Sequence, residues 1–290
     1  MTADAVLRPM RPADVPGAQE SAYESLRAAG QEYGWHMPVL DDAVRERGRR
    51  RCEHLLRTDP DGAFVAEVDG ALVGVAMATV RGPLWFLSLL TVATAAQSRG
   101  LGRRLLGLAE QTRGGAAAIC ASNDPKALRR YRLAGFDLHP CLEGRGPLDR
   151  SLLPAVPEVR EGSYDDDREL VEHVAVLQRG APHGPDLDLL ATTGRLLVAD
   201  SPVGRGYVVV GPGGPALLGA TTPAAATALL WAALAEADDE EVEVPWADAR
   251  QQWALDVAVA ARLPLLLGGA RCTAGPVGLR TPYLPSGGLG

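Results

Sequence analysis

Hydrophobic residues follow two kinds of spacing along the first half of the chain. Short runs that are alternately or continuously apolar predict strands at 6–8, 63–68, 72–80, 84–92 and 116–121, and a last strand entered at 136. Apolar residues three or four positions apart predict helices at 14–28, from 41 or 42 to 56, at 101–111 and at 123–133. Asp14 is expected to cap the first of these helices. This order predicts an α/β (α+β) fold, in which a mixed, mostly antiparallel twisted sheet is flanked by helices.

A glycine-containing turn, Gln97 to Gly102, joins the apolar strand 84–92 to the helix that begins near residue 101. Glycine lets the backbone approach a ligand closely, and the first turn of a helix offers unpaired N–H groups and the positive end of the dipole. The turn is therefore a predicted anion site. A nucleotide, a dinucleotide or a coenzyme would each suit it.

The composition narrows the classes of function. The chain has 290 residues, of which 47% are hydrophobic and 22% charged, enough for one large or two ordinary domains. The net charge of −7 argues against a nucleic-acid partner. The four cysteines form no CxxC pair and the five histidines form no HExxH motif, so neither a disulfide framework nor a metal site is expected.

The chain shows no targeting or membrane signal. Its first residues include acidic side chains and lack the apolar core of a signal peptide. No apolar run approaches the roughly 20 residues of a membrane span. We therefore expect a soluble cytoplasmic protein without a membrane partner.

Two groups of residues match the halves of one known signature. The first group is Gln97, Gly100 and Gly102. The second is Asn123, Ala127, Tyr131, Gly135 and Phe136. Together with the order of the elements, they resemble the GCN5-related N-acetyltransferase (GNAT) superfamily over roughly residues 6–141.

The resemblance implies that acetyl-CoA is the cosubstrate, with its pyrophosphate at the glycine turn and its pantetheine along the open edge of strand 84–92. It also implies direct transfer of acetyl to an amine in a ternary complex, with Tyr131 as the general acid. The alternative for Tyr131 is a core aromatic on an amphipathic helix. The coenzyme-binding residues implied are Leu90, Thr91, Val92, Gln97, Ser98, Arg99, Gly100, Leu101, Gly102, Arg103 and Asn123.

The sequence does not identify a general base. Weak candidates lie in or near the loop predicted at 30–38, which borders the acceptor pocket in relatives, and are Glu24, Glu32, Tyr33 and His36. Proton loss to bulk water is equally admissible. Cys120 and Cys141 would permit a covalent route, but their places on predicted strands favour small core residues. The acceptor is expected to be an amine of a small molecule or a peptide, and a homodimer is left open.

The second half of the chain repeats the predicted elements of the first. Strands are expected at 158–160, 196–199, 206–210, 216–220 and 242–244, and helices up to 177, at 224–237 and within 247–263. The stretch from Glu143 to Pro157 is expected to be loop and marks the boundary. We therefore expect two tandem GNAT-like lobes: a coenzyme-binding domain at 1–145, a linker at 146–157 and a degenerate domain at 158–290. The second lobe has Pro223 to Thr227 in place of the glycine turn, so we expect it to shape the acceptor pocket.

The last residues, 279–290, are rich in proline and glycine, which predicts a flexible or extended tail. A tail that returns to the acceptor pocket with Tyr283 or Gly290 is the alternative. Two functions remain at this point. One is an acetyl-CoA-dependent N-acetyltransferase, and the other is an acetyl-CoA-binding sensor that lacks turnover.

Overall fold

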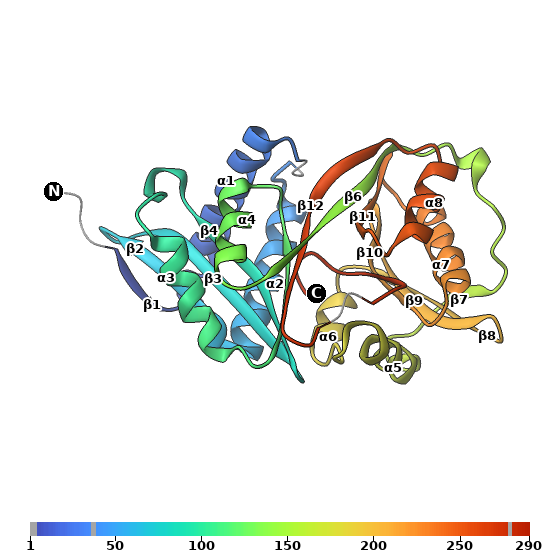
Figure 1. Ribbon diagram of the computed structural model, residues 1–290, viewed down its shortest axis with the longest axis horizontal. Helices are drawn as coiled ribbons and strands as arrows, with labels where there is room; N and C mark the ends of the chain where they lie inside the picture. Colours follow the sequence, from blue (N-terminus) through green and yellow to red (C-terminus); the bar gives the residue numbers. More distant parts are fainter. Residues whose placement is uncertain (1–4, 36–38, 278–279) are drawn as a thin grey trace.

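The computed structural model describes residues 5–35, 39–277 and 280–290, which form two sheets and the helices that cover them (Figure 1). The larger sheet contains β1 (Val6–Pro9), β2 (Ala63–Val68), β3 (Ala71–Arg81), β4 (Leu84–Val92), β5 (Ala116–Ala121), β6 (Asp137–Pro147), β11 (Glu241–Asp248) and β12 (Leu265–Ala274). The smaller sheet contains β7 (Val159–Glu161), β8 (Arg195–Ser201), β9 (Gly204–Gly211), β10 (Gly214–Ala220) and β13 (Tyr283–Leu284). The helices are α1 (Val15–Tyr33), α2 (Asp42–Thr58), α3 (Leu101–Ala109), α4 (Pro125–Leu133), α5 (Arg168–Arg179), α6 (Asp186–Leu190), α7 (Pro223–Ala235) and α8 (Gln252–Ala260).

Local sequence signals account for most element boundaries in the first lobe. Asp69 and Gly70 both have positive φ, as a two-residue hairpin turn between β2 and β3 requires. Helix α2 begins after Asp41, whose carboxylate accepts a hydrogen bond from the Val44 N–H at 2.7 Å. Helix α4 begins in the same way after Asp124, with Pro125 at its first position. The predicted α/β fold class is confirmed.

Three local expectations were wrong. Helix α1 continues to Tyr33, so the first residues of the loop predicted at 30–38 are helical. Asp14 does not cap this helix, because its carboxylate pairs with the Arg8 guanidinium at 2.7 Å and accepts the Arg11 N–H. The stretch from Glu143 to Pro147, expected to be loop, is the second half of β6 because β11 pairs with it.

The two halves of the chain exchange strands in the larger sheet, whose order is β1-β2-β3-β4-β5-β12-β6-β11. Strand β12, from the end of the chain, lies antiparallel between β5 and β6. Strand β6, from the first half, lies between β12 and β11. Figure 1 shows β6 and β12 crossing from one lobe to the other. A boundary at 146–157 therefore begins inside β6, and strands of one continuous sheet lie on both sides of it.

Residues 280–290 of the tail pack against the rest of the protein. Strand β13 pairs antiparallel with β10, and Tyr283 and Leu284 are each 1% exposed. The Tyr283 hydroxyl donates to the Gly290 carbonyl at 2.8 Å, and Arg179 donates to the Leu289 carbonyl at 3.1 Å. The segment is extended at β13, as one of the two expectations from composition had it, and its buried apolar side chains hold it against the fold.

One hydrophobic core passes through both lobes. Val65, Val75 and Met77 point from the larger sheet towards α1 and α2. The same cluster of buried side chains continues into the second lobe through Leu187 of α6 and Tyr207 of β9. The opposite face of β3 packs against α3 and α4. None of the helices within the described ranges has the length and apolar character needed to cross a membrane.

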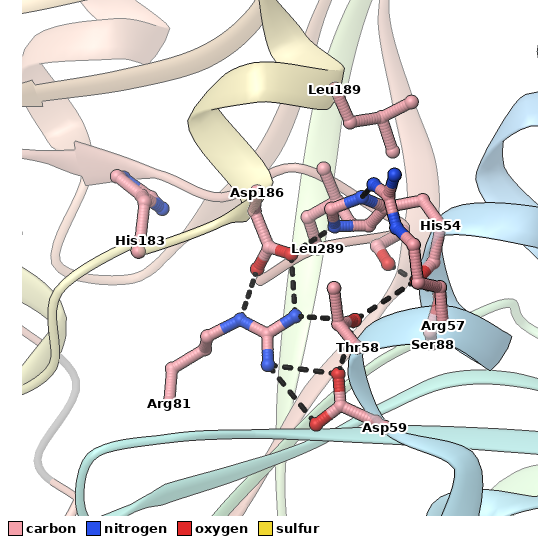
Figure 2. A network of polar contacts seen from close by, with 12 residues as sticks. His54, Arg57, Thr58, Asp59, Arg81, Ser88, His183, Asp186, Leu189 and Leu289 are labelled. Atoms are coloured by element: carbon pink, nitrogen blue, oxygen red, sulfur yellow. Dashed lines mark hydrogen bonds and ion pairs between the residues drawn. The ribbon is translucent and has the colours of Figure 1, made fainter.

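A buried polar network joins the lobes beside this core (Figure 2). Asp186 of α6 is fully buried and accepts hydrogen bonds from Arg81 at 2.6 and 2.8 Å, and its carboxylate lies 2.8 Å from Nε2 of His54. Arg81 also pairs with Asp59 at 2.9 Å. Burial alone would raise the pKa of Asp186, but the contacts with His54 and Arg81 outweigh it and lower the pKa.

We expect Asp186→Asn to lower the free energy of unfolding by about 3–5 kcal/mol, because it removes the carboxylate that pairs with the buried guanidinium of Arg81. Urea unfolding followed by tryptophan fluorescence measures this loss. Asp188→Asn on the same helix is the matched control, since its pair with Arg168 is exposed and should contribute less than about 1 kcal/mol.

The sign of the pH dependence follows from the lowered pKa. The carboxylate of Asp186 stabilises the fold above its unfolded-state pKa, and this contribution is lost as pH falls through the folded-state pKa. The stabilities of the wild type and Asp186→Asn should therefore converge below about pH 4. A constant difference down to pH 2 would contradict this role.

Candidate functional site

Strand β4 leaves part of one edge without a neighbouring strand. It pairs with β3 along its length, but with β5 only from Leu84 to Leu87. The register between β3 and β4 shifts at this point, so Ser88 is an extra residue in β4. This bulge turns the strand away from β5 and opens a gap beside residues 88–92.

A cavity of about 600 Å³ fills this gap and extends between the two lobes. It is lined by most of the residues that the resemblance implied: Leu90, Thr91, Val92, Gln97, Ser98, Gly100, Leu101, Gly102, Asn123 and Tyr131. Arg99 and Arg103 are exposed and do not line it. The structure therefore brings ten of the twelve implied residues to one place.

The glycine turn presents a row of free donors. Ser98 and Gly100 have positive φ, and α3 begins directly after Gly100. The backbone N–H groups of residues 98–102 have no acceptor within the described part of the chain. The N–H of Arg103 is used, because it donates to the Gly100 carbonyl at 3.1 Å. Five adjacent donors at a helix start form a concave anion site.

Cations surround the turn. Lys126, Arg129 and Arg130 line the cavity from the side of α4. A Cβ on Gly102 would overlap the Arg130 guanidinium, so glycine is needed there for this arginine to lie over the start of α3. The arginines that follow the turn add exposed positive charge. The set fits a polyphosphate group, which donors and cations hold together.

Gln97 and Asn123 hold the cavity walls in place. The Gln97 amide donates to the Val92 carbonyl at 3.1 Å and accepts from Lys126 at 3.1 Å, so it joins the end of β4 to α4. The Asn123 amide donates to the Tyr33 carbonyl at the end of α1, at 3.0 Å. The Oδ1 atom of Asn123 and the Oγ1 atom of Thr91 are buried without a hydrogen-bond partner. These two oxygens are acceptors that a ligand can satisfy.

Tyr131 combines both roles considered for it. Its ring packs edge-on against Phe136, with centroids 6.4 Å apart, and belongs to the core around α3 and α4. The residue also lines the cavity, and its hydroxyl has no hydrogen-bond partner among the described residues. Burial raises the pKa of this phenol, so it is protonated at neutral pH and can donate a proton.

The far end of the cavity contains a carboxylate that sequence reasoning missed. Glu143 of β6 lines the cavity, and burial raises its pKa although Arg145 partly opposes this. Arg145 lies 3.6 Å from Glu143 and 2.7 Å from Glu243 of β11, so it is shared between them. A carboxylate with a raised pKa inside a cavity suits a general base. Its signal was hidden because Glu143 stands in a glycine-rich stretch that resembles a loop.

The bases suggested by the sequence lie elsewhere. Glu24 and Glu32 are exposed on α1 and do not line the cavity. Tyr33 contributes its carbonyl to Asn123, and His36 lies outside the described residues. Burial raises the pKa of the Cys141 thiol to about 11 and that of Cys120 further, which keeps both thiols protonated and makes a covalent acetyl-cysteine route unfavourable.

The corresponding edge in the second lobe is closed. Strand β13 pairs with β10 through Leu218 and Gly219, the position equivalent to the open edge of β4. Helix α7 begins after Thr222, whose hydroxyl accepts the Ala225 N–H at 3.2 Å, and Pro223 has no N–H to offer. Neither the edge nor the helix start of this lobe is available to a coenzyme.

Comparisons with known proteins agree with this fold. Residues 22–136 match the family model described as "Acetyltransferase (GNAT) family". A Pyrococcus horikoshii protein provisionally named an acetyltransferase has a TM-score of 0.74 at 19% identity, over 99% of this chain and 96% of that chain. A GCN5-related N-acetyltransferase from Sphaerobacter thermophilus has a TM-score of 0.62 at 18% identity, over 96% and 98%. A tandem GNAT protein from the clavulanic acid biosynthesis pathway has a TM-score of 0.57 at 16% identity, over 94% and 98%.

A comparison with curated proteins found no match. The structural similarity extends over both lobes, so the expected tandem GNAT-like fold is confirmed. The identities are all below 20%, and the similarity therefore concerns the fold.

We expect Gly100→Ala to weaken coenzyme A binding about fivefold or more, because an alanine at this left-handed position is strained by about 1–2 kcal/mol. Isothermal titration calorimetry with coenzyme A measures the change. Gly107→Ala is the matched control. Gly107 lies in α3, the helix that follows the turn, is exposed and has open space around its Cα. Equal affinity of the two variants would show that the turn does not hold the coenzyme.

Proposed function

We propose that this protein, whose residues 22–136 match the GNAT acetyltransferase family model, is an acetyl-CoA-dependent N-acetyltransferase that moves acetyl directly from the thioester to an amine. One observation carries the proposal. A single cavity contains the free N–H groups of the glycine turn, the hydroxyl of Tyr131 and the carboxylate of Glu143. A proton donor and a proton acceptor beside the coenzyme site favour turnover over a sensor.

The chain offers two kinds of backbone contact to acetyl-CoA, which supplies the activated acetyl group when bound. The N–H groups of residues 98–102 would hold the pyrophosphate, with Lys126 and Arg130 as counter-charges. The free edge of β4 at Leu90 and Val92 would pair with the amides of pantetheine as an added strand. The Val92 carbonyl already accepts from Gln97, but a carbonyl oxygen has a second lone pair.

The reaction requires one proton to leave the amine and another to reach the sulfur. Glu143 would accept the amine proton, so that the nitrogen lone pair forms the bond to the acetyl carbonyl carbon. The carbon–sulfur bond then breaks, and Tyr131 would donate its phenolic proton to the leaving thiolate. The products are the amide and the free thiol. The proton held by Glu143 returns through solvent to Tyr131, which restores both groups.

We expect Tyr131→Phe to lower kcat about 100-fold or more, because general acid catalysis contributes this much to proton transfers of this kind. Coenzyme A affinity should stay within about twofold, since the ring and its packing are kept. Thiol release from acetyl-CoA with a panel of amines measures the rate. Tyr164→Phe, which removes a hydroxyl bonded to the Gly194 carbonyl in the second lobe, is the control and should retain kcat. Full activity of Tyr131→Phe would remove this residue from the mechanism.

Glu143 should set the acidic limb of the pH–rate profile. Its raised pKa means that kcat/KM increases with pH as the carboxylate ionises, with an inflection above the usual carboxylate range of about 4. Glu143→Gln should abolish this limb and lower kcat about 100-fold.

Glu243→Gln tests the same assignment by another route. It frees Arg145 to pair with Glu143 and removes a nearby negative charge, so the inflection should move to lower pH while activity is retained. An unchanged inflection in both variants would exclude Glu143 as the base.

A further inference from the structure

The acceptor end of the cavity has two charged walls. One wall is formed by β6 and β11, where Glu143, Arg145 and Glu243 lie together. The other is formed by α2 and the tail, where Arg51 lines the cavity beside Gly287. The bulge of β4 at Ser88 lies next to this second wall, because the Ser88 hydroxyl donates to the Gly288 carbonyl at 2.5 Å.

Most of these charges already have partners. Arg145 is neutralised by Glu243 at 2.7 Å and lies near Glu143 at 3.6 Å. Arg51 has no ion pair and no hydrogen bond within the described part of the chain, and its Nε atom is buried without a partner. A buried guanidinium N–H without an acceptor is unfavourable by itself. A ligand in the cavity that carries an acceptor would satisfy this N–H group.

The position of Arg51 separates it from the cations of the coenzyme site. Lys126, Arg129 and Arg130 lie on α4 beside the glycine turn, where the phosphates would bind. Arg51 lies on α2 and packs against the backbone of the tail, since a Cβ on Gly288 would be 2.8 Å from its Nη1 atom. This backbone contact fixes the guanidinium on the acceptor side.

We propose that the acceptor carries a carboxylate as well as its amine, and that Arg51 binds this carboxylate while the amine faces Glu143. The proposal deepens the proposed function and rests on it for the role of the amine. The planar fork of an arginine matches a carboxylate in two parallel hydrogen bonds. One unpaired guanidinium balances a single negative charge, which favours a carboxylate over a phosphate dianion. Arg51 is a specificity-determining residue in this scheme.

Binding to the coenzyme A complex tests the proposal without requiring turnover. The protein loaded with coenzyme A is titrated, by calorimetry, with the twenty common amino acids and with their carboxamides, which keep the amine and lack the negative charge. At least one acid should bind the wild type at least tenfold more tightly than its amide. Arg51→Met should remove this preference. It should weaken the binding of the acid about 10- to 100-fold and leave the affinity for the amide unchanged.

Two further variants keep the result interpretable. Arg51→Lys retains the positive charge but lacks the planar guanidinium, so it should keep part of the preference for acids. This variant replaces Arg51→Met in the test if Arg51→Met does not fold. Arg47→Met, at an exposed position of the same helix outside the cavity, should behave as the wild type. The proposal is overturned if no acid is preferred to its amide, or if Arg51→Met weakens acids and amides equally through its packing on Gly288.

Thiol release with the same probes separates the two proposals. If thiol release is as efficient with the amides as with the acids, the result supports the proposed acetyltransferase and rejects the proposal that the acceptor carries a carboxylate. The opposite result is that acids bind more tightly than amides, that Arg51→Met loses this preference, and that no amine causes thiol release. It would reject the proposed acetyltransferase and keep the proposed carboxylate site.

Discussion

The structure depends on how the unpaired edges of its β-strands are filled. A strand edge with free N–H and C=O groups must find a partner, and this chain fills the gap between β5 and β6 with β12 from its opposite end. In return, β6 supplies the neighbour that β11 needs. Each half therefore completes the sheet of the other. The polar network around Asp186 and the shared hydrophobic core add further contacts between the same two halves. Neither lobe has a complete set of partners by itself.

The matching strand edges of the two lobes differ, because that of β4 is open and that of β10 is paired. In the first lobe the bulge at Ser88 keeps β4 away from β5, and the free edge lies in the cavity. In the second lobe β13 covers the matching edge of β10, and Thr222 caps the helix that would otherwise offer its N–H groups. The tail that closes the edge of β10 also helps to build the cavity, since Gly287 lines it and Gly288 packs against Arg51. The edge of β10 is thus closed, and that of β4 is left open, because the tail that contains β13 packs against the second lobe.

Local signals in the sequence predicted most of the first lobe. The bounds of β2, β4 and β5 agree with the runs of apolar residues that predicted them, because turns and alternation are encoded within a few positions. Strand β12 was missed, and a tail that packs back onto the protein was only the alternative expectation, since their partners lie far away in the sequence and their glycines resemble those of loops. Glu143 was missed for the same reason. A carboxylate becomes a candidate base only through burial, and its burial comes from β11 and β12.

The exchanged strand also makes the room in which the proposed chemistry takes place. Strand β12 carries Gly268 and Gly269 where its register against β6 shifts, directly under the cavity. A Cβ on Gly269 would overlap the Ala121 carbonyl of β5, so only glycine allows the two backbones to approach there. A Cβ on Gly268 would stand 3.5 Å from the carboxylate of Glu143 and occupy space beside it. The second half of the chain, whose own edge at β10 is covered by β13, therefore forms the floor and one wall of the cavity and buries Glu143.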